Sequence, residues 1–250
     1  MTLPATLALM LLAIPWRPAL AVLGSLGIVM AALIFLVTPR YEQGAVAHPQ
    51  DNASPMREAK RRAFAFPVLL TIGIVDSATR MGFLLFLPFV LRDKGASEQT
   101  IGLAMTLVFA GGAAGKLACA FIGARIGAIA TVWLTEGSTA AGIVALFPLP
   151  LGGALVVLPL IGVALNGTSS VLYGSVPDLV LPQRRGRALS VFYTGTIGSG
   201  ALAPVLFGRV GDTFGIWPAL SLVACFVLFT LPLAAFLRTA LSRAPSVETA

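Results

Sequence analysis

The chain has 250 residues, of which 57% are hydrophobic and only 11% are charged, and its formal net charge is +7. Soluble domains are about 25% charged, so this composition excludes an ordinary soluble protein and indicates a polytopic membrane protein. The two cysteines lie far apart in apolar stretches and the single histidine lies in a polar one. We therefore expect no disulfide framework, no metal, no cofactor and no histidine proton relay. The basic residues lie in short loops between apolar stretches, which indicates membrane orientation and not a nucleic-acid partner.

The predicted elements begin with an incomplete span and one full span. Residues 3–15 are apolar but too short to cross a bilayer, which takes about 20 residues, and we interpret them as the end of a span whose start is missing. Residues 19–37 are long enough to cross. Residues 38–66 are polar, contain three prolines and carry a cluster of basic residues. We expect them to form a cytoplasmic linker that follows the remnant of an N-terminal bundle, residues 1–37.

The next apolar run carries two charges in its interior. Residues 67–91 are long enough to span, and they contain Asp76 and Arg80. Side chains four residues apart project from one face of a helix and lie close enough to pair. A charge at mid-bilayer costs on the order of 3 kcal/mol, so we expect both residues to face a protein interior or a wet cavity. They would either couple transport to protonation and contact the solute, or form a structural ion pair that fixes the helix in its bundle.

Five further spans complete the predicted fold. They cover residues 100–120, 128–147, 152–173, 188–208 and 216–237. The chain is thus predicted to be an all-α polytopic membrane protein with seven full transmembrane helices and one partial N-terminal helix. Residues 67–238 would form a six-helix bundle and residues 239–250 a cytoplasmic tail. Glycines and basic residues predict tight turns at 123–127 and 209–215.

A glycine-rich stretch in the span at 100–120 partly matches a phosphate-binding loop. The segment AGGAAGK begins with Ala110 where that loop needs glycine, and Leu117 follows the lysine where Ser or Thr is required. We exclude a nucleotide site and expect these small residues to let neighbouring helices approach closely. An intramembrane enzyme is also excluded, because the sequence has no HExxH pattern and no histidine in a span.

Alternate loops differ in their content of basic residues. Of the 17 Lys and Arg residues, twelve fall on the side of the linker and the C-terminus, four fall on the other side, and one lies in a span. Cytoplasmic loops carry the excess of Lys and Arg. We therefore expect a multi-pass protein of the inner cell membrane whose linker and C-terminus are cytoplasmic.

Several later spans contain polar side chains. Glu136 lies near the middle of its span without a charged neighbour within one helical turn, so it would either carry a proton or hold two helices together as a neutral, hydrogen-bonded acid. The spans at 152–173 and 188–208 carry polar and aromatic residues that suit either a mostly apolar pocket or hydrogen bonds between helices. These pocket candidates are Asn166, Thr168, Ser169, Tyr173, Tyr193 and Thr194.

The six-helix part resembles the C-terminal half of a major facilitator superfamily transporter. The resemblance rests on VPDLVLPQRRGRA at 176–188, on FYTGTIGSGALAPVLFG at 192–208, and on GRVGDTFG at 208–215. The segment GKLACAFIGARIG at 115–127 lies where the family repeats its signature loop, although the acidic position of that signature has no counterpart here. The resemblance implies cytoplasmic loop motifs made of Gly115, Lys116, Arg125, Asp178, Arg184, Arg185, Gly186 and Arg187. As an alternative, Lys116 and Arg125 would be interfacial anchors.

The resemblance also implies a function. Members of the family move small organic solutes by alternating access, and we expect proton coupling. We expect the efflux type, because the pocket as a whole would be mostly apolar with few charges. The expected partners are the lipid bilayer, a small-molecule substrate, protons and a complementary N-terminal half, because the family's site lies between two bundles. The alternative is a non-transporting membrane scaffold or a truncated remnant. Asp76→Asn would distinguish the two, since it should abolish flux and spare a scaffold's binding.

Overall fold

The computed structural model describes residues 15–37 and 55–241 of the chain, which are helical apart from short turns. The chain divides into two units, residues 1–52 and residues 53–250. The described part of the first unit is one helix, α2 (Trp16–Val37), which contains the span predicted at 19–37. Nearly all of the partial span predicted at 3–15 lies outside the described residues. No strand occurs in the described ranges, and the prediction of an all-helical membrane protein is confirmed.

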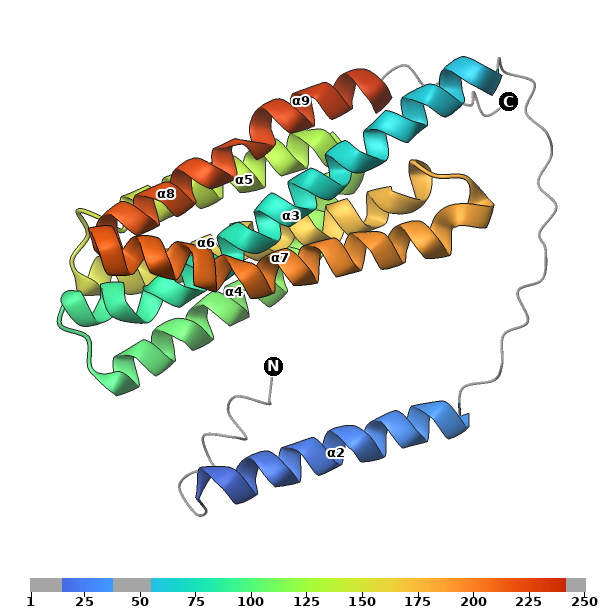
Figure 1. Cartoon of the computed structure of the whole chain (residues 1–250). Helices are drawn as coiled ribbons and strands as arrows, with labels where there is room; N and C mark the ends of the chain where they lie inside the picture. Colours follow the sequence, from blue (N-terminus) through green and yellow to red (C-terminus); the bar gives the residue numbers. More distant parts are fainter. Residues whose placement is uncertain (1–14, 38–54, 242–250) are drawn as a thin grey trace. The chain divides into compact units, whose positions relative to one another are not determined.

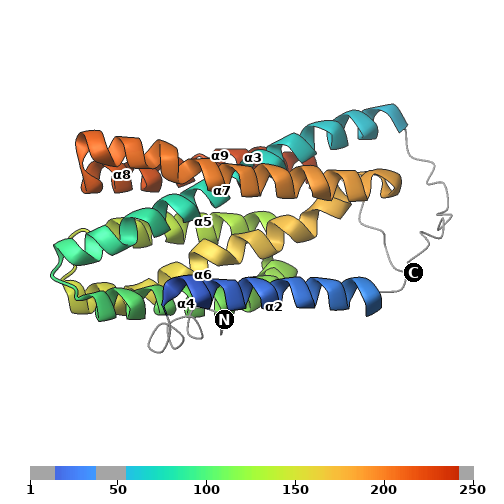
Figure 2. The ribbon, with the colours of Figure 1, turned by 60° about the horizontal axis from the view of Figure 1, so that its bottom comes forward.

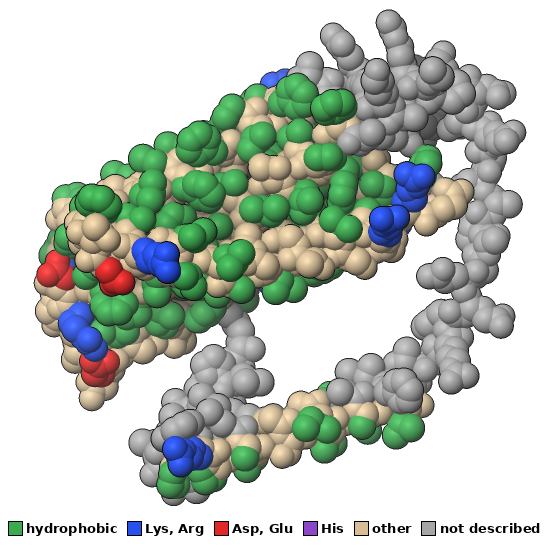
Figure 3. All heavy atoms as spheres, viewed as in Figure 1, with side chains coloured by type: hydrophobic (Ala, Val, Ile, Leu, Met, Phe, Trp, Pro, Cys, Tyr) green, Lys and Arg blue, Asp and Glu red, His purple; other side chains and the backbone are tan. Residues whose placement is uncertain are grey.

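The second unit is a bundle of helices (Figure 1). Its elements are α3 (Pro55–Asp93), α4 (Glu98–Ile126), α5 (Ala128–Ala145), α6 (Leu151–Ser175), the 3-10 helices η1 (Val176–Asp178) and η2 (Pro182–Arg184), α7 (Arg185–Phe214), α8 (Ile216–Leu228) and α9 (Thr230–Leu241). Within the described residues, six segments are long and apolar enough to cross a membrane, the last of them formed by α8 and α9 together. In the two views of Figures 1 and 2, the helices of this unit follow roughly one common direction. Figure 3 shows hydrophobic side chains over the flank of the bundle and charged ones toward its ends.

Several helices are longer than predicted. α3 begins at Pro55, so the last part of the predicted linker is helical. The turns predicted at 123–127 and 209–215 are wrong in extent, because α4 and α7 continue through them. Each helix ends at a single glycine with a positive φ, 86° at Gly127 and 93° at Gly215, a conformation that side chains with a Cβ rarely adopt. A helix near lipid keeps its own backbone hydrogen bonds for as long as it can, which shortens the turn to that one residue.

The glycines of α4 allow a close approach to α6. A Cβ at Gly111 would lie 2.0 Å from the carbonyl oxygen of Pro159, and a Cβ at Gly115 would lie 2.3 Å from the carbonyl oxygen of Val163. The fit is reciprocal, because a Cβ at Gly162 of α6 would lie 2.2 Å from the backbone oxygen of Val108. The predicted close helix packing at the AGGAAG segment is confirmed, and this contact fixes α4 against the bundle.

This contact gives a stability prediction. Gly111→Ala should lower the free energy of unfolding by about 1–3 kcal/mol, because the added methyl group meets backbone atoms and α6 has to shift. Gly102→Ala is the matched control on the same helix, since nothing lies within 4 Å of a Cβ at that position. Thermal unfolding of the purified variants in one detergent checks the difference. Equal melting temperatures for the two variants would contradict this account of the packing.

A buried polar layer separates two apolar clusters inside the bundle. Along α3, Ile72 belongs to one cluster and Phe83 to the other, and Asp76 lies between them. The same order recurs along α5, where Val132 and Ile143 flank Glu136. We call the following buried residues the polar layer: Asp76, Ser77, Thr79, Thr135, Glu136, Thr139, Thr168, Ser169, Thr196 and Thr230. Polar groups half-way along membrane helices are costly, so this layer is the first place to look for a functional site.

Candidate functional site

The α3 helix supplies an ion pair to the polar layer. Asp76 is 3% exposed, and the Arg80 side chain is 20% exposed. Arg80 Nη2 donates to Asp76 Oδ2 at 3.2 Å, so the structure contains the pair that the four-residue spacing predicts. Ser77, on the neighbouring face of α3, donates from Oγ to the carbonyl oxygen of Thr196 at 2.7 Å. This hydrogen bond fixes α3 against α7 beside the ion pair.

Glu136 of α5 is the third charged member of the cluster. It is 1% exposed, and its carboxyl group lies near the carboxyl group of Asp76 and the hydroxyl group of Thr168 on α6. The interpretation of Glu136 as a lone carboxyl is therefore wrong in three dimensions, because α3 brings Asp76 beside it. The structure collects Asp76, Arg80 and Glu136, which we call the charged cluster, from two helices.

Hydroxyl groups extend the charged cluster. Thr168 Oγ1 donates to Thr135 Oγ1 at 2.7 Å, and Thr135 Oγ1 in turn donates to the carbonyl oxygen of Thr131 at 2.8 Å. With its hydrogen used in this way, Thr168 can still accept a hydrogen bond from a protonated Glu136. Among the described residues, Glu136 Oε1 is one of the buried side-chain oxygens without a hydrogen-bond partner. A buried polar atom left without a partner typically costs about 1–3 kcal/mol, so this oxygen is a place for an incoming proton.

The charge balance of the cluster defines what it can do. Two ionised carboxylates and one guanidinium leave one net negative charge in a buried space. A single proton on either carboxyl group makes the cluster neutral and also supplies a donor between Asp76 and Glu136. Carboxyl groups in contact away from water titrate as a pair and share a proton. The geometry therefore allows the cluster to bind and release one proton, which belongs to the pair of carboxyl groups together.

The pocket candidates on α6 divide into two groups. Thr168 belongs to the cluster described above. Asn166 donates from Nδ2 to the carbonyl oxygen of Gly162 at 3.2 Å, and Ser169 donates from Oγ to the carbonyl oxygen of Asn166 at 2.9 Å. A Cβ at Gly112 would lie 2.5 Å from Asn166 Nδ2, so that amide fills the contact between α4 and α6. Asn166 and Ser169 thus hydrogen-bond within their own helix.

The tyrosines form a connection between α6 and α7. The ring of Tyr173 stacks on that of Tyr193, with centroids 4.5 Å apart, and the Tyr173 hydroxyl group lies 3.2 Å from Thr196 Oγ1. Tyr193 is 47% exposed, and Thr194 is exposed too. These residues present an aromatic and polar face on α7, one helix away from the charged cluster.

Other buried polar residues are absent from the predicted site. On α5, threonines recur at four-residue intervals, at Thr131, Thr135 and Thr139. Together with Glu136 they lie on the buried side of the helix. This spacing on an apolar span is a signal that could have identified a polar helix face from the sequence. Thr79 on α3 is another such residue, and among the described residues its Oγ1 is buried without a hydrogen-bond partner, as is that of Thr139.

The two basic motifs differ in structure. Gly115, Lys116 and Arg125 all lie within α4, so the predicted loop at this motif is wrong, and Gly115 instead packs against α6. The second motif does form a connection. Asp178 ends η1, Arg184 ends η2, and Arg185, Gly186 and Arg187 begin α7. The connection is held by Arg185, whose Nε donates to the carbonyl oxygen of Pro177 at 3.3 Å.

Comparison with known proteins identifies the family. The sequence model of the Major Facilitator Superfamily matches residues 69–249, which is more than half of the chain. The chain belongs to the major facilitator superfamily. The match covers α3 to α9, so the charged cluster lies in the part that carries the family resemblance.

One protein similar in sequence and one similar in structure show how far the likeness extends. A stretch of 103 residues is 34% identical to the MFS antiporter QDR3 of Candida albicans (strain SC5314 / ATCC MYA-2876), and it covers 39% of this chain and 14% of that protein. A crystal structure of the peptide transporter POT, a mutant in complex with sulfate, is similar with a TM-score of 0.60 and 21% identity over 70% of this chain and 38% of that one. The second likeness shows the superfamily fold. The chain thus spans less than half the length of either protein.

Proposed function

We propose that this chain acts as part of a secondary transporter that moves a small organic solute by alternating access and couples its movement to that of protons in the same direction. The observation that carries the proposal is the charged cluster, which lies in the polar layer between two apolar clusters of a membrane bundle. Ionisable residues inside membrane spans commonly mark substrate and proton pathways. The printed name of the fungal relative, an antiporter, agrees with the coupled movement of two species.

Arg80 would link the proton to the solute. It is the most exposed member of the charged cluster, so its guanidinium group has two competing partners, the Asp76 carboxylate inside and an anionic group of a solute outside. Protonation of Asp76 removes the charge that holds Arg80 and frees the guanidinium group for the solute. Loss of that proton restores the ion pair and releases the solute. Asp76 then binds a proton more tightly when Arg80 is paired with the solute than when Arg80 is paired with Asp76. This difference in proton affinity is the condition for coupling.

The proposal predicts that an anionic solute collapses a proton gradient through this chain. Everted membrane vesicles that contain the full chain are energised until they acidify, and the gradient is followed with the fluorescent amine ACMA. The vesicles are loaded beforehand with one compound from a panel of organic sulfonates and dipeptides, so that solute and protons can leave together, and sulfonates do not carry protons through lipid by themselves. We expect at least one compound to restore ACMA fluorescence in these vesicles and to have no effect in vesicles without the chain.

Matched variants decide whether the charged cluster couples the solute to protons. Glu136→Gln should abolish the response, because the amide cannot take up a proton. Glu98→Gln is the control, since Glu98 is an exposed acid that pairs with Arg92 in the connection from α3 to α4, and it should leave the response unchanged. A response that survives in Glu136→Gln would contradict proton coupling at this cluster. No response to any compound of the panel would favour the scaffold interpretation instead.

A further inference from the structure

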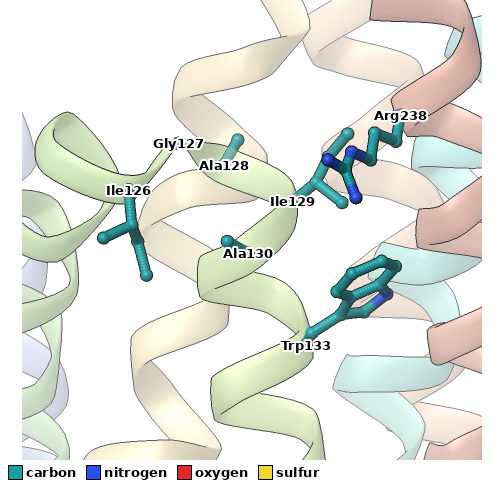
Figure 4. A pocket seen from close by; sticks show the side chains of 7 residues that line it. All are labelled: Ile126, Gly127, Ala128, Ile129, Ala130, Trp133 and Arg238. Atoms are coloured by element: carbon teal, nitrogen blue, oxygen red, sulfur yellow. The ribbon is translucent and has the colours of Figure 1, made fainter. Parts of the chain in front are cut away.

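A cavity lies at one end of the bundle, between the start of α5 and the end of α9 (Figure 4). Its volume is about 410 Å³. It is lined by Ile126, Gly127, Ala128, Ile129, Ala130, Trp133 and Arg238. The wall is thus apolar apart from one guanidinium group and the edge of one indole ring. It lies at the ends of α4 and α9, whereas the charged cluster lies half-way along the helices, so the two sites are separate.

Arg238 is held over an aromatic platform. Its Cζ lies 5.9 Å from the centre of the Trp133 ring, and Trp133 Nε1 donates to the carbonyl oxygen of Leu231 at 3.0 Å. The indole ring is therefore fixed by α9, the helix that carries Arg238. Figure 4 shows the Arg238 side chain reaching from α9 toward Ile129 and Trp133. In the range 55–241, neither of the two ion pairs, Arg80 with Asp76 and Arg92 with Glu98, involves Arg238. A guanidinium group without a carboxylate partner, at the mouth of a cavity, is suited to pair with a phosphate group.

The charges of the two bundle ends differ. The end of α4, the connection from α6 to α7 and the end of α9 share one end, because successive helices run in opposite directions (Figure 1). Between α4 and α9 this end carries five arginines and one acid, namely Arg125, Arg184, Arg185, Arg187, Arg238 and Asp178. The opposite end carries three basic and three acidic residues, namely Arg92, Lys94, Arg209, Asp93, Glu98 and Asp212. A basic end faces the leaflet that is rich in anionic lipid.

We propose that the cavity binds an anionic phospholipid. The headgroup phosphate pairs with Arg238, and an acyl chain lies against Ile126, Ile129 and Trp133. The apolar wall favours a lipid over a free phosphate ion, because an ion leaves that wall without a partner. The basic end of the bundle favours an anionic lipid over a zwitterionic one. This site is independent of the proposed transport function.

The test uses Trp133 as a reporter. The full chain carrying Trp16→Phe and Trp217→Phe is reconstituted in phosphatidylcholine vesicles, which leaves Trp133 as the fluorophore. Brominated phosphatidylglycerol or brominated phosphatidylcholine is then added as a contact quencher. We expect half-maximal quenching at an about fivefold lower mole fraction of the anionic lipid, the ratio expected for one arginine near an anionic surface. Equal quenching by both lipids would overturn the proposal.

Variants and a competitor sharpen the result. Arg238→Gln should remove the preference, whereas Arg209→Gln, at the opposite end of the bundle, should keep it. Inorganic phosphate should leave the quenching by phosphatidylglycerol unchanged, and protection by phosphate would show a site for a free anion and overturn the lipid assignment. Native mass spectrometry of the chain with its tryptophans intact, comparing retained phosphatidylglycerol in Arg238→Gln and Arg209→Gln, covers the case that the tryptophan variant fails to fold. Equal retention in the two variants would also overturn the proposal.

Discussion

Arg80→Gln is expected to lower the free energy of unfolding by about 3 kcal/mol. The substitution leaves two carboxyl groups in the polar layer without their cation, and removing one partner of a buried pair typically costs about 3–5 kcal/mol. The lower end of that range applies because the Arg80 side chain keeps 20% of its exposure. In an Asp76→Asn background the same substitution should cost much less, since the charge that needs Arg80 is gone.

A cysteine provides the measurement for this double-mutant cycle. Cys119 is buried and Cys225 is exposed, so in a Cys225→Ser background the reaction of Cys119 with a fluorogenic thiol reagent reports unfolding in detergent. Arg92→Gln is the control, because Arg92 and Glu98 form an exposed pair, for which about 0–1 kcal/mol is expected. Equal losses for Arg80→Gln and Arg92→Gln would contradict a buried role for Arg80. The double variant Asp76→Asn, Arg80→Gln should remain folded and yet fail in the vesicle assay, which separates transport from stability.

Glu136→Leu is expected to stabilise the chain by about 1 kcal/mol while abolishing proton coupling. Leucine has a similar volume, and the substitution removes both an unpartnered oxygen and the second carboxyl group beside Asp76. Replacing buried charges by apolar residues of similar volume is often neutral or stabilising by about 1–4 kcal/mol. A residue that lowers stability and is needed for activity is typical of a functional site.

The same Cys119 assay and the ACMA assay check this prediction together. Glu136→Gln serves as the conservative comparison, because it keeps the hydrogen-bonding shape of the side chain and removes its charge. It should be folded and inactive, with a stability between those of the unmodified chain and Glu136→Leu. A loss of about 2 kcal/mol or more in Glu136→Leu would show that Glu136 holds the helices together, which is the other interpretation that the sequence left open.

The spans were predictable because their signal is local. A membrane helix must satisfy all of its backbone hydrogen bonds internally, so hydropathy over about 20 residues is enough to locate it. The helix ends were less predictable, because apolar composition does not record how far a helix continues beyond the hydrocarbon. The glycines near the end of α4 pointed to an early turn, whereas the backbone turns only at Gly127.

The candidate site was predictable to the extent that its contacts lie within one helix. Asp76 and Arg80 pair across one helical turn, and their spacing alone predicts this. The contact between Asp76 and Glu136 joins α3 to α5 and depends on the packing of the whole bundle, which no spacing along the chain encodes. Tyr193 and Thr194 illustrate the converse, because their polarity pointed to a pocket although both are exposed on α7.

The polar layer also has a consequence for how the protein enters the membrane. α3 leaves the ribosome before α5 and α6, so its two charges meet lipid before the helices that later enclose them have been made. Because the Asp76–Arg80 pair closes within a single turn of α3, the helix carries its own counter-charge at that moment. Glu136 has no such local partner along α5, but a carboxylic acid can enter lipid with its proton bound. The order in which these residues occur along the chain therefore suits insertion of one helix at a time.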